Sequence, residues 1–341
     1  MKKTTPLISV IIVNWNGKHH LIPCLSSLNK ITYKNIEIIV VDNNSTDGSQ
    51  AAVKSRSKKN IILVQNNDNK GFAEANNIGF NYAKGKYVLF LNNDTIVDAD
   101  FLEPLVAQLE ANRMTAGNQP KILQYPNTKL VDSIGSYFVI SGFLYHIGHN
   151  KPDRAKNNTR LPVFTMKGAC MLFRKSVLDK VGVFDPDYFA YFEETDLCQR
   201  IWLAGYELWY EPNSVIYHKG GQTSQFIPTD YITFHSYKNR ILTYLKNCEG
   251  STLWAIMPFH YALCEVIAFI YLLTAKPGLF LSVQKALFWP LFNIGSIRSK
   301  RNAVQCLRKK TDNGYLPTVT RSVRPDYYFH LYSSSLKGYI D

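Results

Sequence analysis

Short apolar runs alternate with segments of helical character over the first hundred residues of the chain. The apolar runs cover residues 7–13, 36–41, 61–64 and 87–91. The segments expected to be helical lie between these runs, at residues 21–28, 49–56 and 72–83. Uninterrupted apolar runs are typical of buried strands. Since strands that alternate with helices pair in parallel, the pattern predicts a doubly wound α/β sheet.

The alternation becomes less regular after residue 101. A helix is expected near residues 101–112, and the sequence that follows, to about residue 160, is rich in Pro, Asn, Gly and Lys. Such a composition predicts loops. Regular structure is expected to begin again at residues 164–173.

A helix with one apolar face is predicted at residues 194–204. Two short strands, 207–210 and 214–217, are then expected to lead to His218. From residue 231 onward the chain is expected to be largely helical.

Two apolar stretches stand out in this last part, at residues 259–275 and 278–294. The first is at the short limit for a membrane span of roughly twenty residues. Trp254 and Trp289 lie near the edges of the stretches, and a basic cluster follows, made by Arg298, Lys300, Arg301, Arg308, Lys309 and Lys310. Aromatic edges and basic flanks favour helices in the interface of the inner leaflet. A buried helical pair or a homodimer contact is the alternative.

The chain is accordingly divided into three parts. Residues 1–245 are expected to form the α/β domain, residues 246–310 an apolar and basic helical extension, and residues 311–341 a C-terminal tail.

Composition and charge narrow the possible partners. Of the 341 residues, 19% are charged and 13% are aromatic, and the net charge is +13. This balance fits anionic lipid, a phosphorylated ligand or nucleic acid. The six cysteines include no CxxC pair, which favours reduced thiols in a cytosolic setting. The first apolar run is interrupted by Asn14 and Asn16, which favours a strand over a signal peptide.

The strand at residues 87–91 ends in the polar triplet Asn92, Asn93 and Asp94. The carboxyl ends of strands in an α/β sheet open onto the ligand crevice. Carboxylate and amide oxygens at such an edge suit magnesium or manganese. Without support from elsewhere in the chain, the triplet would be read as a simple turn after a strand.

The second strand ends at Asp42, within the sequence VVDNNSTDG. A carboxylate there can accept the imide N–H of a uracil or thymine ring. A calcium loop is excluded, because Gly48 comes one place late and Val53 stands where a bidentate Glu is needed. A plain capped turn is the remaining alternative.

The helix after the third strand begins near Lys70 and Gly71. A basic residue and a helix N-terminus can together bind a diphosphate, although a solvated lysine beside a turn glycine is an equal alternative. No GxGxxG motif is present, which argues against a dinucleotide-dependent dehydrogenase.

Three acidic residues surround the start of the predicted helix at residues 194–204. Asp196 can pair with Arg200 four residues later, which favours a structural role. Glu193 or Glu194, preceded by an aromatic stretch, is better placed as a partly desolvated general base. His218 becomes a candidate metal ligand if Asp94 binds a metal.

These segments together carry a family resemblance. In order they are VIIVNWNG, VVDNNSTDGS, NKGFAEANNIG, LFLNNDT, KGACMLFR, FEETDLCQRIWLAGY and the late His218. They resemble the family 2 glycosyltransferases of the GT-A fold, above all rhamnosyltransferase-like members that build bacterial cell-surface polysaccharides. The resemblance covers roughly residues 6 to 245.

The resemblance implies roles for individual residues. Asp94 and His218 would hold a divalent metal, manganese or magnesium, and Glu194 would be the catalytic base, with an exchange of roles with Glu193 left open. The expected nucleotide-sugar-binding residues are Asn14, Asn16, Asp42, Asn44, Lys70, Gly71, Asn76, Asn92, Asn93, Gly168 and Ala169. Asn92 replaces the usual first Asp of the family's DxD motif, and Glu194 stands where many relatives have Asp.

The implied activity is inverting transfer of a sugar from dTDP-rhamnose or a UDP-sugar to a saccharide acceptor, expected to be polyprenyl-linked.

The expected location is the cytoplasmic face of the cell membrane, as a peripheral or monotopic protein on anionic lipid. A homo-oligomer is compatible with the sequence, and a nucleic-acid partner is not expected because no such motif is present. The alternative enzyme class is a sugar-nucleotide nucleotidyltransferase. Such an enzyme would have a Gly-rich basic loop where this chain has NWNGKHH.

Overall fold

The computed structural model describes residues 5–56, 61–221 and 227–328. Four parallel strands run through the first part of the chain, in the spatial order β4, β1, β2, β3. Their bounds are β1 (Ile8–Asn14), β2 (Ile36–Asp42), β3 (Ile61–Gln65) and β4 (Tyr87–Leu91). The predicted α/β architecture is therefore confirmed.

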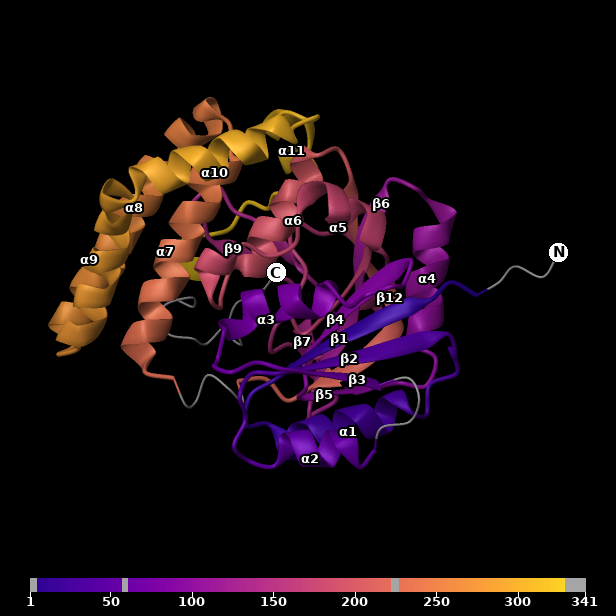
Figure 1. The fold of residues 1–341 in the computed structure, drawn as a ribbon. Coiled ribbons are helices and arrows are strands. Elements are labelled where there is room, and N and C mark those ends of the chain that lie inside the picture. Colours follow the sequence, from indigo (N-terminus) through magenta and orange to yellow (C-terminus); the bar gives the residue numbers. More distant parts are fainter. Residues whose placement is uncertain (1–4, 57–60, 222–226, 329–341) are drawn as a thin grey trace.

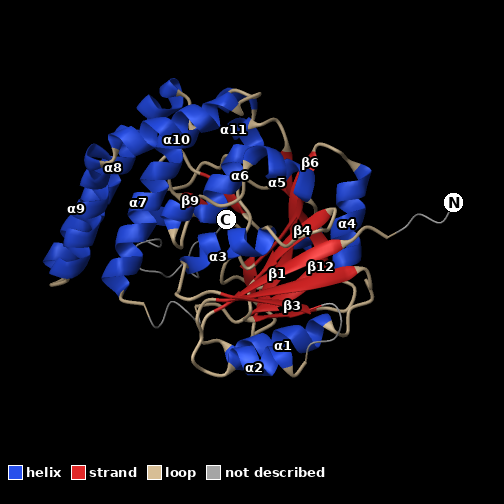
Figure 2. Cartoon of the chain, in the orientation of Figure 1, coloured by secondary structure: helices blue, strands red, loops and turns tan. Residues whose placement is uncertain are grey.

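Helices cover both faces of this sheet (Figures 1 and 2). The helices of the first part are α1 (Lys18–Leu28), α2 (Ser49–Lys54), α3 (Gly71–Phe80) and α4 (Leu102–Ala111). Because side chains alternate along a strand, Val10 and Ile12 of β1 pack with α1, α2 and α4, whereas Ile11 packs on the opposite face with α3. The two layers of core hold the sheet rigid, so that the strand ends form a fixed edge for a site.

The second part of the chain extends the same sheet beyond β4. The added strands follow the order β11, β6, β12, β10, with β5 and β7 paired to β12 and β6. Their bounds are β5 (Thr95–Val97), β6 (Thr115–Gln124), β7 (Val131–Ser133), β10 (Leu161–Pro162), β11 (Cys170–Arg174) and β12 (Glu207–His218). A separate hairpin is formed by β8 (Ser136–Phe138) and β9 (Leu144–His146).

Two sequence predictions in this part were wrong. Residues 112–160, expected to be loops, contain β6, a buried strand in the middle of the sheet. Its polar composition concealed it, since Asn118 and Lys121 are buried but each finds a partner on a neighbouring element. The strands expected at 207–210 and 214–217 are one strand, β12, with a register shift between Glu211 and Val215.

The C-terminal part is helical, as predicted. Its helices pack on one another and on α6, and they curve around one side of the sheet domain (Figure 1). The helices of the second half are α5 (Lys175–Val181), α6 (Glu193–Leu203), α7 (Thr229–Asn247), α8 (Gly250–Leu273), α9 (Pro277–Phe292), α10 (Ile294–Cys306) and α11 (Leu316–Val319). Short 3-10 turns are η1 (Ala155–Asn158), η2 (Pro186–Tyr188) and η4 (Asp312–Gly314). The division at residues 245 and 310 stays a prediction.

Helix α8 is the one helix in the described part of the chain that is long and apolar enough to cross a membrane. It has 24 residues with a mean hydropathy of 1.8, and 22% of its most apolar window is buried inside the protein. All six cysteines are free thiols.

Candidate active site

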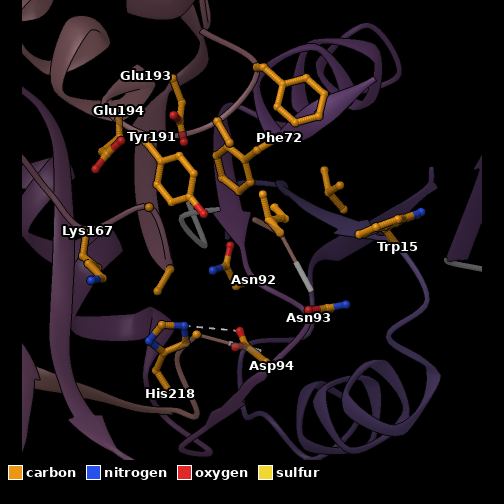
Figure 3. Close-up of a pocket in the computed structure, with 18 of the residues that line it drawn as sticks. Trp15, Phe72, Asn92, Asn93, Asp94, Lys167, Tyr191, Glu193, Glu194 and His218 are labelled. Atoms are coloured by element: carbon orange, nitrogen blue, oxygen red, sulfur yellow. Dashed lines mark ion pairs between the residues drawn. The ribbon is translucent and has the colours of Figure 1, made fainter. Parts of the chain in front are cut away.

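A cavity of about 620 Å³ opens at the carboxyl ends of the parallel strands (Figure 3). The predicted site residues that line it are Gly71, Asn92, Asn93, Asp94, Gly168, Ala169, Glu193, Glu194 and His218. They come from α3, the end of β4, the segment before β11, the start of α6 and the end of β12. Segments that are more than a hundred residues apart in sequence therefore meet in one place.

Asp94 and His218 face each other on one side of the cavity. Asp94 follows β4, His218 ends β12, and pairing of β12 with β5 places His218 opposite Thr95. Asp94 Oδ1 lies 3.3 Å from His218 Nε2, and this buried oxygen accepts no hydrogen bond. On the other edge of the ring, Nδ1 donates to Asp132 Oδ2 at 2.9 Å.

The charges of these groups depend on each other. Burial alone would lower the pKa of His218, but the carboxylates of Asp132 and Asp94 outweigh it and raise the pKa of His218 to about 9. Burial alone would raise the pKa of Asp94, but His218 and His20 hold it below its usual value. A divalent cation held by His218 Nε2 would replace the proton on that nitrogen, because a histidine that binds a metal must be neutral.

This pair fits a divalent cation that takes further ligands from elsewhere. Asp94 supplies a buried carboxylate oxygen with no hydrogen-bond donor, and His218 supplies an imidazole nitrogen facing it. Both ligand types suit manganese. Within the described residues no group of three or more His, Cys, Asp or Glu side chains is arranged to hold a metal. The remaining ligands would have to come from water and a bound phosphate.

Glu193 and Glu194 lie on the cavity wall away from Asp94 and His218 (Figure 3). Both stand at the start of α6, where the helix dipole favours negative charge. Burial, together with the charge of Glu194, raises the pKa of Glu193 well above its ordinary value, and burial also raises the pKa of Glu194. Glu193 is 6% exposed and its Oε2 has no hydrogen-bond partner. Carboxyl groups with raised pKa values are suited to act as general bases.

Asp196, by contrast, has the structural role that the sequence favoured. It is fully buried, and its Oδ2 accepts from Arg200 at 3.0 Å.

Six of the residues predicted to bind the nucleotide sugar do not line the cavity; they are Asn14, Asn16, Asp42, Asn44, Lys70 and Asn76. The carboxylate of Asp42 is 1% exposed and accepts hydrogen bonds from Asn14, Ser45 and Gln50 at 3.1, 2.9 and 2.8 Å. Asp42 thereby holds the turn after β2.

The side chains or backbone of the other five residues are likewise engaged in local structure. Asn16 accepts from the backbone N–H of Thr46, and Asn76 donates to the carbonyl of Phe72. Lys70 pairs with Asp68 at 2.8 Å. Asn44 has a positive φ of 63°, in the turn that Asp42 caps. The contact of these residues with a nucleotide stays a prediction.

The sequence did not point to several residues that the cavity contains. Trp15, Asn43, Lys167 and Tyr191 line it, as does His146 from the β8–β9 hairpin. Asn43 and Trp15 lie beside predicted residues, so adjacency could have found them. Asp132 lies in the stretch expected to be loops, where no periodic pattern marked it.

Residues 9–182, just over half of the 341 residues, match the family model described as glycosyl transferase family 2. The chain belongs to this family. GlyG, a glycosyltransferase of Streptococcus pneumoniae, is 38% identical over 106 residues, which are 30% of this chain and 35% of GlyG. The N-acetylglucosaminyl-diphospho-decaprenol L-rhamnosyltransferase of Mycobacterium tuberculosis is 25% identical over 283 residues, covering 76% of this chain and 90% of that protein.

Solved structures of glycosyltransferases share the fold. GalNAc-T7 with UDP, GalNAc and Mn2+ has a TM-score of 0.58 and 19% identity, covering 72% of this chain and 48% of that one. Residues 1–349 of S. aureus TarS with UDP-GlcNAc have a TM-score of 0.58 and 17% identity, covering 88% and 90%. The GT-A fold is thus confirmed. This family 2 chain spans only 35% and 34% of the length of two relatives that it matches.

Proposed function

We propose that this family 2 protein is an inverting glycosyltransferase that moves a sugar from a nucleoside-diphosphate sugar to a saccharide acceptor. One observation carries the proposal. Two glutamates with raised pKa values, Glu193 buried and Glu194 half-buried, share a cavity with an aspartate–histidine pair suited to a divalent cation. A base on one wall and a cation site on another are the two functions that a single displacement needs.

In this reaction Glu194 accepts the proton of an acceptor hydroxyl. The acceptor oxygen forms a bond to the anomeric carbon while the bond from that carbon to the diphosphate oxygen breaks, and nucleoside diphosphate leaves. Attack from the side opposite the leaving group inverts the configuration. Glu194 is assigned as the base because it is half-buried, whereas Glu193 is almost fully buried. Manganese or magnesium bound by Asp94 and His218 would stabilise negative charge on the departing diphosphate.

The donor is proposed to be dTDP-rhamnose or a UDP-sugar, and the acceptor a polyprenyl-linked saccharide. The M. tuberculosis relative supports both rhamnose and a diphospho-polyprenyl acceptor, because the alignment covers 90% of its length. The solved structures with UDP-GlcNAc, and with UDP and Mn2+, support a uridine donor and a divalent metal.

Association with the cytoplasmic face of the membrane, as a peripheral or monotopic protein, is part of this proposal. Exposed apolar side chains on α8 and α9 support it, among them Trp254 at 83%, Leu273 at 83% and Phe292 at 85% exposure.

The basic cluster supports association with anionic lipid less than the sequence suggested. Lys300 pairs with Asp185 at 2.5 Å, and Arg308 with Asp312 at 2.9 Å. These charges are engaged in holding the fold together, so apolar contact would have to provide most of the binding to lipid.

The test uses the full chain with Mn2+, a panel of nucleoside-diphosphate sugars and N-acetylglucosaminyl-diphospho-polyprenol. We expect release of nucleoside diphosphate with one donor only when the acceptor is present, together with a glycosylated lipid product. Formation of a nucleotide sugar from a nucleoside triphosphate and a sugar phosphate, without glycosyl transfer, would instead identify a nucleotidyltransferase.

A further inference from the structure

The five residues before the two glutamates follow an unusual backbone path. Phe189, Tyr191 and Phe192 have positive φ angles of 56°, 71° and 71°. Side chains with a β-carbon rarely adopt this region, and such conformations persist only where the surroundings hold them. Some other part of the protein must therefore hold residues 188–192 in place.

That part is Asn239, a fully buried residue in the middle of α7. Its Nδ2 lies 3.0 Å from the carbonyl oxygen of Tyr188, 3.0 Å from that of Ala190 and 2.7 Å from that of Tyr191. The two N–H groups of one amide thus serve three carbonyls within four residues. The carbonyl of Tyr188 also accepts from the backbone N–H of Ala190 at 2.6 Å, whereas the carbonyls of Ala190 and Tyr191 depend on the amide of Asn239.

The same segment is also tied to the start of α3, where Gly71 and Phe72 line the cavity. The carbonyl of Phe189 accepts from the backbone N–H groups of Phe72 and Ala73, at 2.7 and 3.2 Å, at the start of α3. Gly71 has a φ of +77°, and a β-carbon there would come within 2.6 Å of the Phe189 carbonyl oxygen. Tyr191 lines the cavity itself.

The segment therefore determines where the glutamates stand. Phe192 is the last residue before α6, and Glu193 and Glu194 are the first two residues of that helix. A change in the path of residues 188–192 would rotate or shift the first turn of α6, and with it the carboxylates.

We propose that Asn239 is a positioning residue for the catalytic carboxylate. It fixes the backbone of residues 188–192 and so keeps Glu194 within reach of the acceptor hydroxyl. Asn239 does not line the cavity and lies outside the residues that match the family model. The inference rests on the proposed function, because it assumes that Glu194 is the base.

Asn247 provides a matched control. It is also fully buried on α7, and its Nδ2 donates to Asp196 Oδ1 of α6 at 3.0 Å. A substitution there also removes a buried side-chain amide of α7, but the amide of Asn247 bonds to α6 itself and has no bond to residues 188–192.

The experiment compares Asn239→Ala and Asn247→Ala in the full chain. For each variant the thermal midpoint, the dissociation constant for nucleoside diphosphate with Mn2+, and kcat and KM for the acceptor reaction are measured. We expect both to lose thermal stability, but only Asn239→Ala to lose kcat, by about tenfold to a hundredfold, since misplacement of a reacting group by about 1 Å can cost that much. Its nucleotide affinity should stay close to that of the unmodified protein.

Equal kcat values in the two variants would overturn the inference. If Asn239→Ala does not fold, Asn239→Ser and Asn239→Asp replace it. Full kcat in any folded Asn239 variant would likewise overturn the inference. Failure of every Asn239 variant to fold, while Asn247→Ala folds, would overturn it as well, because the role would then be in folding. An unmodified protein without transferase activity would instead refute the proposed function.

Discussion

At the residue scale, the two glutamates differ in what their removal should do. Glu194→Gln is expected to lower kcat by about 10²- to 10⁴-fold, the usual value of general-base catalysis, while the affinity for nucleoside diphosphate is unchanged. Since burial raises the pKa of Glu194, the rise of kcat with pH in the unmodified protein should be centred above 4.5, the value of an ordinary Glu.

Glu193→Gln serves as the comparison. The charge of Glu194 raises the pKa of Glu193, so Glu193 is still protonated and neutral while Glu194 loses its proton, and the rise of kcat in Glu193→Gln should stay at the same pH. Measurement of kcat from pH 4 to 9 in the unmodified protein, Glu194→Gln and Glu193→Gln checks the position of the rise and the loss of kcat. If Glu193→Gln loses activity and Glu194→Gln keeps it, Glu193 is the catalytic base and Glu194 is not.

Asp132 is the residue-scale feature that the sequence did not reveal. Its carboxylate accepts the Nδ1 proton of His218 at 2.9 Å and so sets which ring nitrogen faces Asp94. Carboxylates that orient a metal-binding histidine in this way typically contribute about 10- to 100-fold in metal affinity.

We therefore expect Asp132→Asn to weaken Mn2+ binding by about that factor in a titration followed by electron paramagnetic resonance. Asp153→Asn is the control, because Asp153 pairs with Lys121 of β6 at 2.8 Å and does not contact His218. Equal Mn2+ affinity in the two variants would show that Asp132 does not orient His218.

At the element scale, a strand could be predicted from the sequence when its buried side chains are apolar. Strands β1, β2 and β4 lie in the interior of a parallel sheet, so nearly every residue is apolar and the sequence marks them directly. Strand β6 is equally buried, but its polar side chains bond to other segments: Asn118 to α4, 10 and 13 residues away, and Lys121 to Asp153, 32 residues away. A pattern of apolar positions cannot show such pairing, because it depends on the completed fold.

The residues of the candidate site also fall into those that the sequence marked and those that it did not. Asp94, Glu194 and His218 were found because each ends a strand or begins a helix that has a clear pattern. Asp132 and Asn239 escaped prediction because their roles arise from contacts with segments 86 and about 50 residues away. Asp42 was expected in the cavity, but the turn that it caps occupies its oxygens.

A buried ion-pair network also joins α6, η2, α7 and α10. Lys246, with a side chain that is 2% exposed, lies 2.6 Å from Asp185 and 3.0 Å from Asp196. Removal of one partner from a buried pair leaves the other charge unpaired, which costs about 3–5 kcal/mol. Lys246→Met should therefore lower the free energy of unfolding by about that amount in urea titrations at pH 7.

Lys300→Met is the matched comparison, because Lys300 also pairs with Asp185 but is 26% exposed. A partly exposed pair is worth about 1 kcal/mol or less. Burial alone would raise the pKa of Asp185, but Lys246 and Lys300 hold it below its usual range, so this stabilisation is present at neutral pH and is lost in acid. Equal losses of stability in the two variants would contradict a buried network centred on Lys246.

At the scale of the whole molecule, the helices of the C-terminal part have two surfaces with different partners. On their inner surface the helices pack on one another: Tyr237 and Ile241 of α7, Cys264 of α8 and Val283 of α9 belong to one buried cluster, which also includes Phe143 between β8 and β9. Their outer surface is apolar and exposed. Deletion of this part would open the core of the protein, so surface substitutions are the better test of membrane binding.

We expect the triple substitution of Trp254, Leu273 and Phe292 by Ser to release the protein from lipid vesicles in a flotation assay. Each of these side chains is more than 80% exposed, and full burial of a large apolar side chain contributes about 1.5–3 kcal/mol, which is roughly tenfold or more in partitioning. Transfer to a water-soluble acceptor analogue should be unchanged, since none of the three lines the cavity.

The control is the triple substitution of Tyr82, Met114 and Ile140 by Ser, which are 47%, 46% and 54% exposed but lie outside α8 and α9. Its binding to vesicles should equal that of the unmodified protein. If the α8–α9 variant instead keeps its vesicle binding and changes from dimer to monomer in light scattering, the apolar surface is a contact between two copies of the chain. In that case the acceptor lipid would have to reach the cavity without help from α8 and α9.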